Sequence, residues 1–299
     1  MISGQVVRPV EPREFASDEL LLSTRQHPRL LTLLRLLGHL SPFAITGLAY
    51  ELLNPLFSDP SKVHVRELWD AEARLFSVMT AEGRRPLSLL IAQHQRVWLD
   101  VICGTIYLLF LIQIVGLAIY LFFRDRPRSL QLSLGFLLAN VLGWLVWYVY
   151  PAAPPWYVEA YGLGPVVGHV ASSPAGLARL DTWLGLPIAH TFYAQSTDVF
   201  GALPSLHVAY ASLSVWAAAP LGRPLRWATV SYAIGLAFSA LYLRHHYLID
   251  VIAGVLLASL VASALSMLFQ WARHVTVRRQ LRSARPPSRP FVPQQGEQP

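Results

Sequence analysis

A histidine and an aspartate late in the chain have the spacing of a nucleophilic site. His246 and Asp250 lie four positions apart, which places both side chains on one face of a helix. An aspartate there accepts the proton of one imidazole nitrogen, so that the other nitrogen directs its lone pair at an electrophile. Gly254 and Ala258 continue this face with small side chains that let a neighbouring helix approach. The structural alternative is a buried polar pair that holds two helices together.

A second histidine, His207, follows Pro204 and Ser205 where a helix is expected to begin. Proline is favoured in a first helical turn, and the free N–H groups of such a turn attract anions. A phosphate suits this position. A histidine at a helix start is by itself more often a cap or an interfacial side chain. Together with His246 and Asp250, it predicts phosphoryl transfer.

Composition indicates where this chemistry takes place. Of the 299 residues, 54% are hydrophobic and 14% charged, which leaves too few polar side chains to coat a soluble domain. We therefore predict an integral membrane protein. The formal net charge is +7, but the arginines cluster beside apolar stretches, where they act as topology signals rather than as a nucleic-acid site. Cys103 is the one cysteine and has no disulfide partner in the chain.

Six apolar stretches approach the roughly 20 residues that a transmembrane helix needs. The predicted fold is thus all-α, a polytopic membrane bundle of six transmembrane helices. An interfacial or re-entrant helix is the alternative for the first stretch, which contains Pro42 and Glu51. The stretches are 36–57, 97–123, 130–150, 204–219, 225–243 and 247–271.

The arginines predict the orientation. Six spans place both termini, the Arg124–Arg128 loop and Arg226 on one side, which the positive-inside rule makes cytoplasmic. Both histidine motifs then face outward. The strong preference for arginine over lysine suggests a bacterial protein, and hence the inner membrane. Mixed charges and apolar residues over 59–96 predict an amphipathic helix in the headgroup layer.

The chain is expected to comprise three parts. Residues 1–29 form a cytoplasmic N-terminal tail, and residues 30–273 form the membrane catalytic domain with an outer-face loop over 151–203. Residues 274–299 form a basic, proline-rich tail that is expected to be disordered and to lie near anionic headgroups.

Five stretches resemble, in order, the inositol phosphorylceramide synthases, the aureobasidin-resistance family within the type-2 phosphatidic acid phosphatase and vanadium haloperoxidase superfamily. The resemblance covers about a third of the chain, roughly 151–257, and the first half is similar only in hydropathy. Two features of the wider phosphatase pattern are absent: an arginine where this chain has Ala240, and a clear first motif. Both absences point to the synthase branch. The stretches are Ala153–Tyr157, Tyr161–Gly162, Pro174–Asp181, Phe200–His207 and Tyr242–Asp250.

The resemblance implies an outward-facing catalytic triad that uses no metal and no cofactor. By position, His246 is the nucleophile, Asp250 its orienting carboxylate and His207 the general acid and base. The implied reaction takes phosphoinositol or a similar headgroup from a glycerophospholipid donor to a lipid alcohol acceptor, ceramide or diacylglycerol, through a phosphohistidine.

Four further residues are expected to bind the substrate. Without a metal, arginines and backbone donors must neutralise the phosphoryl charge. Arg179 and Arg244 are the candidates, and Ser205 and His245 are expected to complete the site. The alternatives are an ion pair of Arg179 with Asp181, an interfacial position for Arg244, and a hydrogen bond from His245 to the outer loop.

Two other functions remain open from the sequence. A lipid phosphate phosphatase would differ only in using water, rather than a lipid alcohol, to release the phosphoryl group. A non-catalytic scaffold or transporter would also span the membrane, but it has no need for His207, His246 and Asp250 at this spacing.

Overall fold

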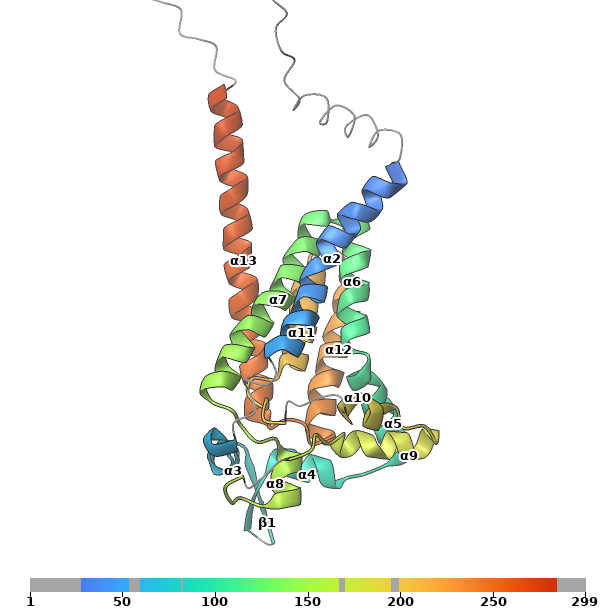
Figure 1. Ribbon diagram of the computed structural model, residues 1–299, viewed down its shortest axis with the longest axis vertical. Helices are drawn as coiled ribbons and strands as arrows, with labels where there is room; N and C mark the ends of the chain where they lie inside the picture. Colours follow the sequence, from blue (N-terminus) through green and yellow to red (C-terminus); the bar gives the residue numbers. More distant parts are fainter. Residues whose placement is uncertain (1–27, 54–59, 82, 167–169, 195–198, 284–299) are drawn as a thin grey trace, which may run out of the picture.

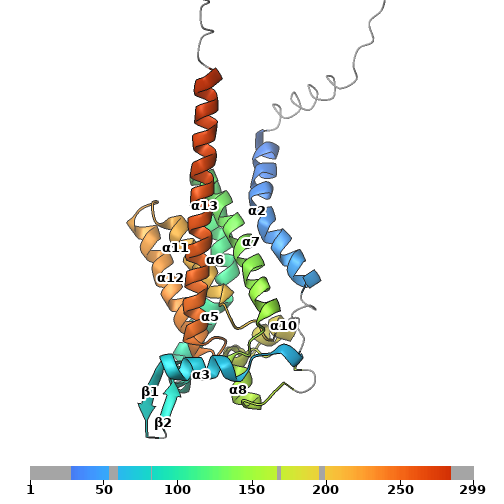
Figure 2. The ribbon, with the colours of Figure 1, turned by 90° about the vertical axis from the view of Figure 1, so that its left-hand side faces the viewer.

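The computed structural model describes residues 28–53, 60–81, 83–166, 170–194 and 199–283. Most of them are helical, and the long helices form an elongated bundle (Figure 1). Helix α2 (Pro28–Leu53) begins, and helix α13 (Leu248–Ser283) ends, at the same end of this bundle. Shorter elements cover the opposite end, so the two ends of the molecule are built differently (Figure 2).

Three helices are long and apolar enough to cross a membrane: α2, α7 (Arg126–Val149) and the first 31 residues of α13. Helices α5 (Val97–Leu108) and α6 (Phe110–Arg124) make a fourth span if they are counted as one, but they bend by 49° between them. The structure thus supports an integral membrane protein with three or four candidate spans among the described residues.

The prediction of six spans is not confirmed by length and composition, because two predicted spans fall short. Helix α11 (Leu206–Ala218) is apolar but has only 13 residues. Helix α12 (Arg223–Tyr242) has 20 residues, but Arg223 and Arg226 in its first turn shorten the apolar run. Both helices nevertheless lie inside the bundle, and α11 contributes Ala209, Leu213 and Ala217 to its main core.

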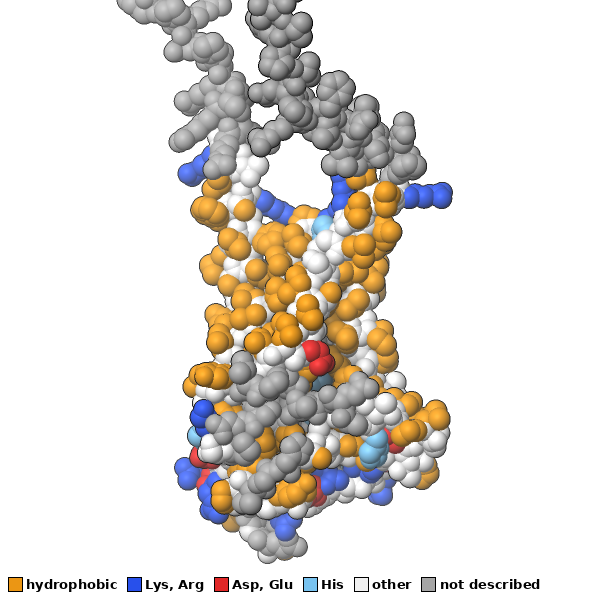
Figure 3. Space-filling model, viewed as in Figure 1, with side chains coloured by type: hydrophobic (Ala, Val, Ile, Leu, Met, Phe, Trp, Pro, Cys, Tyr) orange, Lys and Arg blue, Asp and Glu red, His pale blue; other side chains and the backbone are white. Residues whose placement is uncertain are grey.

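Side chains of different kinds separate along the bundle. In the space-filling view, hydrophobic side chains form a band around the middle, with arginines and lysines gathered beyond it at both ends (Figure 3). An apolar band between two charged ends matches the hydrocarbon layer of a bilayer and its headgroup regions.

The segment predicted as an amphipathic helix contains more than a helix. It forms η2 (Pro60–Lys62), α3 (Arg66–Leu75), a hairpin of β1 (Ser77–Thr80) and β2 (Gly83–Pro86), and α4 (Leu87–Gln93). The antiparallel hairpin corrects the all-α expectation. It forms because Gly83, with a φ of 105°, allows the backbone to reverse after Thr80.

Helix α3 is amphipathic, as predicted, and one of its acidic side chains faces inward. Glu72 is fully buried, and its carboxylate accepts hydrogen bonds of 3.1 Å from the backbone N–H groups of both Leu248 and Ile249. These N–H groups belong to the first turn of α13 and have no partner within the helix. Glu72 therefore fastens α3 to the start of α13.

The predicted outer loop 151–203 is largely folded. It contains helices α8 (Pro155–Tyr161), α9 (Ala178–Leu184) and α10 (Ile188–Ala194), with a short turn, η3 (Ala175–Leu177), before α9. These elements cover the end of the bundle where α13 begins (Figure 1). At its base, Ala152 forms isolated parallel bridges with His64 and with Gly201.

The predicted tails lie mostly outside the described residues. Nothing is described before Pro28, where α2 starts within the predicted tail 1–29, or after Ser283. Helix α13, however, continues past the predicted tail boundary at residue 274. Residues 274–283 contain no proline or glycine, so nothing in the sequence interrupts the helix there.

The start of α13 packs tightly against the start of α11. The position where a Gly254 Cβ would stand overlaps the carbonyl oxygen of Ser205 and touches the backbone N of Ala209 at 3.4 Å. Glycine at this position therefore lets the backbones of α11 and α13 meet. The sequence predicted this close approach, because Gly254 lies on the same helix face as Asp250.

We expect Gly254→Ala to destabilise the folded protein by about 1–3 kcal/mol, because the new methyl group forces the α11 and α13 backbones apart. Thermal unfolding of the purified protein in detergent measures the effect. Gly116→Ala is the matched control, since Gly116 is also helical and has nothing within 4 Å of the added Cβ. Equal unfolding temperatures for the two variants would contradict the close approach.

Candidate active site

The structure brings His207, His246 and Asp250 together at the covered end of the bundle. His246 lies in the turn between α12 and α13, Asp250 in the first turn of α13, and His207 in the first turn of α11. The ring centroids of the two histidines are 5.9 Å apart. His246 is 5% exposed and Asp250 is fully buried.

The contacts of His246 determine which ring nitrogen carries hydrogen. Its Nδ1 is 2.9 Å from the carbonyl oxygen of Ala202 and 3.7 Å from Oδ2 of Asp250. Because a carbonyl oxygen only accepts, Nδ1–H donates to Ala202 and the lone pair remains on Nε2. The sequence predicted that an acceptor fixes the tautomer of His246, without specifying the nitrogen, and assigned that role to Asp250. Ala202 makes the direct hydrogen bond, and the carboxylate lies just beyond hydrogen-bond distance.

Asp250 connects the pieces of the site. Its Oδ2 accepts a 2.8 Å hydrogen bond from the backbone N–H of Tyr247, and its backbone carbonyl accepts one of 3.0 Å from Ser205. Its Oδ1 is buried without a hydrogen-bond partner among the described residues. The aspartate thus holds the turn that carries His246 and supplies a negative charge beside that imidazole.

Tyr107 of α5 supports His207 and was not identified from the sequence. Its hydroxyl oxygen lies 3.3 Å from Nδ1 of His207, and the two rings stack with centroids 4.6 Å apart. Phe110 meets the His207 ring edge-on at 4.4 Å. A tyrosine in an apolar stretch carries no local signal for this contact, which joins residues 100 positions apart.

His245 lies in an aromatic stack. Its ring stacks on Tyr107 at 4.9 Å and on Tyr193 of α10 at 5.1 Å, and its Nε2 is 3.5 Å from the Tyr193 hydroxyl. Burial, together with the nearby His246, lowers the pKa of His245 to about 3. At neutral pH its ring is therefore uncharged and offers a hydrogen bond rather than a positive charge.

Two cavities meet at His246. The first, here named the loop cavity, has about 70 Å³ and lies beneath the folded outer segment. The second, the bundle cavity, has about 240 Å³ and lies between α2, α6, α7 and α11. His246 and Gly201 line both cavities, and His207 lines the bundle cavity.

The two cavities differ in chemistry. Polar and aromatic side chains line the loop cavity, among them Trp156, Ser172, Ser173, Tyr193 and His245. The bundle cavity is mainly apolar, with walls that include Phe43, Tyr50, Phe110, Phe136, Leu206 and Trp144. A charged headgroup suits the first and a hydrocarbon chain the second.

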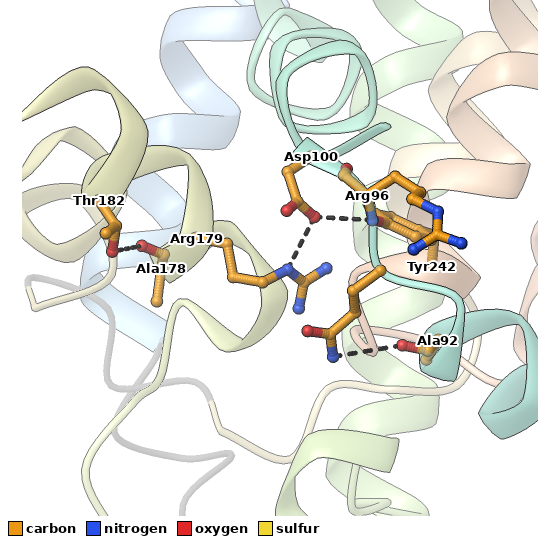
Figure 4. A network of polar contacts seen from close by, with 8 residues as sticks. Ala92, Arg96, Asp100, Ala178, Arg179, Thr182 and Tyr242 are labelled. Atoms are coloured by element: carbon orange, nitrogen blue, oxygen red, sulfur yellow. Dashed lines mark hydrogen bonds and ion pairs between the residues drawn. The ribbon is translucent and has the colours of Figure 1, made fainter. Parts of the chain in front are cut away.

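Arg179 does not line either cavity. Its Nε donates to Oδ1 of Asp100 at 2.7 Å, and its guanidinium lies 5.2 Å from the ring centroid of Tyr242, whose hydroxyl also donates to Asp100 (Figure 4). The alternative partner, Asp181, instead accepts hydrogen bonds from the backbone of Ala189 and from His190. Arg179 therefore links α9 to α5 and α12 rather than reaching His246.

Arg244 lies closer to the loop cavity. It has a left-handed backbone conformation, with a φ of 64°, that turns the chain from α12 towards His245 and His246. Its side chain pairs with Glu159 and lines a cavity of about 410 Å³ that shares Trp156, Ser172 and Ser173 with the loop cavity. Its Nε is buried without a hydrogen-bond partner among the described residues.

Ser205 caps α11 rather than lining a cavity. It is fully buried, and its hydroxyl accepts a 3.5 Å hydrogen bond from the backbone N–H of Val208. Ser205 lines neither the loop cavity nor the bundle cavity, and its contact with the substrate stays a prediction. Within the described ranges, no group of three or more His, Cys, Asp or Glu side chains is placed to hold a metal ion.

Comparison with known proteins identifies the family to which the chain belongs. The sequence profile of the PAP2 superfamily matches residues 66–264. A phosphoinositol dihydroceramide synthase of Bacteroides thetaiotaomicron is 34% identical over 224 residues, 72% of this chain and 72% of that protein. No solved structure matches the chain significantly.

Two fungal proteins are similar over shorter regions. An inositol phosphorylceramide synthase of Candida albicans is 38% identical over 144 residues, 48% of this chain and 30% of that protein. The catalytic subunit of the same enzyme in Schizosaccharomyces pombe is 38% identical over 119 residues, 40% of this chain and 28% of that protein. The resemblance in the sequence is thereby confirmed, and because the profile covers more than half of the chain, this protein belongs to the PAP2 superfamily.

Proposed function

We propose that this protein transfers a phosphorylated headgroup, phosphoinositol or a close analogue, from a glycerophospholipid to a lipid alcohol such as ceramide. The observation that carries the proposal is the position of His246, which lines a polar cavity on one side and an apolar cavity on the other. A headgroup transferase needs a nucleophile at such a boundary. The names of the bacterial and fungal relatives support the choice of substrates.

The proposed first step forms a phosphohistidine. Nε2 of His246 attacks the phosphorus of the donor phosphodiester, and the bond from phosphorus to the diacylglycerol oxygen breaks. His207 donates a proton to that oxygen, so diacylglycerol leaves as an alcohol. The Ala202 carbonyl and the Asp250 carboxylate stabilise the positive charge that develops on the His246 ring.

The second step reverses these roles. His207, now a base, takes the proton of the acceptor hydroxyl, whose oxygen attacks the phosphohistidine. The bond from phosphorus to nitrogen breaks, and His246 returns to its neutral form. The bundle cavity is the proposed site for the acceptor chain, while Arg244 and His245 are the proposed contacts of the headgroup and its phosphate.

The proposed membrane arrangement keeps six spans, with α5 and α6 as one bent span. Arg126 and Arg226 lie at the end where α2 begins and α13 ends, whereas His246 lies at the other end. We place the end that carries Arg126 and Arg226 in the cytoplasm of a bacterium and the active site at the outer face of its inner membrane.

Labelled phosphatidylinositol, incubated with the purified protein, is expected to pass its label to ceramide in preference to water. Separation of the lipid and aqueous products measures the partition.

His246→Ala, His207→Ala and Asp250→Asn should each lower turnover by about a hundredfold or more, because members of one catalytic unit act together. His94→Ala, an exposed histidine, is the control.

Inositol phosphate as the main product at saturating ceramide and diacylglycerol would overturn the transferase proposal and favour a lipid phosphatase. Full turnover in His246→Ala would instead overturn the phosphohistidine mechanism.

Tyr107→Phe is expected to keep the ring stack but to lose the hydroxyl beside His207. We predict a fall in kcat of about tenfold, equivalent to about 1.4 kcal/mol, with KM for both lipids unchanged and a shifted pH profile. Steady-state kinetics from pH 5 to 9 test this. Tyr120→Phe, on the exposed side of α6, should match the parent protein. A change in KM alone would show that Tyr107 acts on binding and not through His207.

Single cysteines are expected to report the orientation. In a Cys103→Ala background, an impermeant thiol reagent added to intact cells should label Ala81→Cys and Leu186→Cys, both exposed at the active-site end. It should label Arg126→Cys and Arg226→Cys only after the cells are opened. The opposite pattern would place the active site in the cytoplasm.

A further inference from the structure

A further cavity lies apart from the active site, where the start of α7, the last turn of α11 and residues 266–273 of α13 meet. It has about 180 Å³. Trp216 lines this cavity and lies nine residues after His207 on helix α11, so at 1.5 Å per residue the two sites are roughly 14 Å apart along that helix. The walls of the cavity include Asp125, Arg128, Gln131, Trp216, Gln270 and Arg273.

Arg128 is held in a fixed position in this cavity. Its Nε pairs with Oδ2 of Asp125 at 3.1 Å, while Oδ1 of Asp125 accepts a 3.2 Å hydrogen bond from the Arg128 backbone N–H. Its guanidinium lies 6.0 Å from the ring centroid of Trp216 on α11. Asp125 engages one of the five guanidinium donors, so the others remain available to a ligand.

Gln131 supplies an independent sign of a ligand. The residue as a whole is 9% exposed, and its amide, which makes no hydrogen bond with any residue that the structure describes, opens onto the cavity rather than being sealed in the protein. Amides of largely buried residues nearly always have hydrogen-bond partners. A polar group inside the cavity would provide this partner.

The charge of the cavity indicates the sign of that group. Arg128 and Arg273 contribute two positive charges, and Asp125 contributes one negative charge that Arg128 already engages. Arginine and amide donors that converge on one space are suited to phosphate oxygens.

We propose that this cavity binds the phosphate group of an anionic ligand through Arg128, Gln131 and Arg273. The phosphate belongs either to an acidic phospholipid of the adjoining leaflet or to a free phosphate anion. Because the site joins α7 to α11 and α13, the helices that carry His207 and Asp250, its ligand also holds together the helices on which the active site is built.

Native mass spectrometry of the full-length protein in detergent tests the site. Dioleoyl phosphatidylglycerol is the anionic probe, dioleoyl phosphatidylcholine the zwitterionic comparison, and inorganic phosphate the free anion. We expect the double variant Arg128→Gln/Arg273→Gln to bind phosphatidylglycerol at least fivefold more weakly. The matched control is Arg223→Gln/Arg226→Gln, which loses the same charge at the same end of the bundle but outside the cavity, and it should bind as the parent protein does.

Gln131→Leu keeps the charge and should also weaken binding, which preserves the test if the double arginine variant does not fold. Competition between inorganic phosphate and phosphatidylglycerol would support a site for the phosphate group that the two share. Binding of inorganic phosphate without binding of phosphatidylglycerol would identify the free anion as the ligand. An equal loss of phosphatidylglycerol binding in the two double variants would overturn the proposal. Equal binding of phosphatidylglycerol and phosphatidylcholine by the parent protein would do the same.

Discussion

The hydrogen bond from the Ser205 backbone N–H to the Asp250 carbonyl oxygen joins the starts of α11 and α13, and the active site depends on this junction. It holds His207 beside His246 although the two residues belong to different parts of the chain. The junction is possible because Gly254 has no side chain, so the α13 backbone can approach the Ser205 carbonyl. A larger residue would separate the two helices and, with them, the two imidazoles.

Because this junction is buried, the N–H groups at the start of α13, which have no partner within the helix, need hydrogen-bond acceptors other than water. Two carboxylates provide them. Asp250 accepts from Tyr247, and Glu72 accepts from Leu248 and Ile249. Negative charge is also favourable at a helix N-terminus because of the helix dipole. Helix α3, which is remote in sequence, is therefore part of the framework that positions His246.

His246 lies between two cavities of different chemistry, and each cavity is formed by a different part of the fold. The folded outer segment supplies a polar cavity, and the membrane helices supply an apolar one. Burial and the nearby His246 keep the neighbouring His245 uncharged, so positive charge near the loop cavity comes from Arg244, which pairs with Glu159. Polar and apolar parts of one lipid can thus approach His246, the proposed nucleophile, from different sides.

Local patterns were sufficient to predict the membrane location, the helical character and the His246 to Asp250 spacing, because each depends on residues within a few turns of one another. The same is true of the short motifs that indicated the family. Contacts between distant segments required the tertiary structure, since no local pattern encodes them. Among these are the Ala202 carbonyl that fixes the His246 tautomer and the Tyr107 hydroxyl beside His207. The ion pair of Arg179 with Asp100, across 79 positions, is a further case. The sequence predicted that Arg179 binds phosphate, with nearby Asp181 as the alternative partner, but the packing of α9 against α5 brings Asp100 to it.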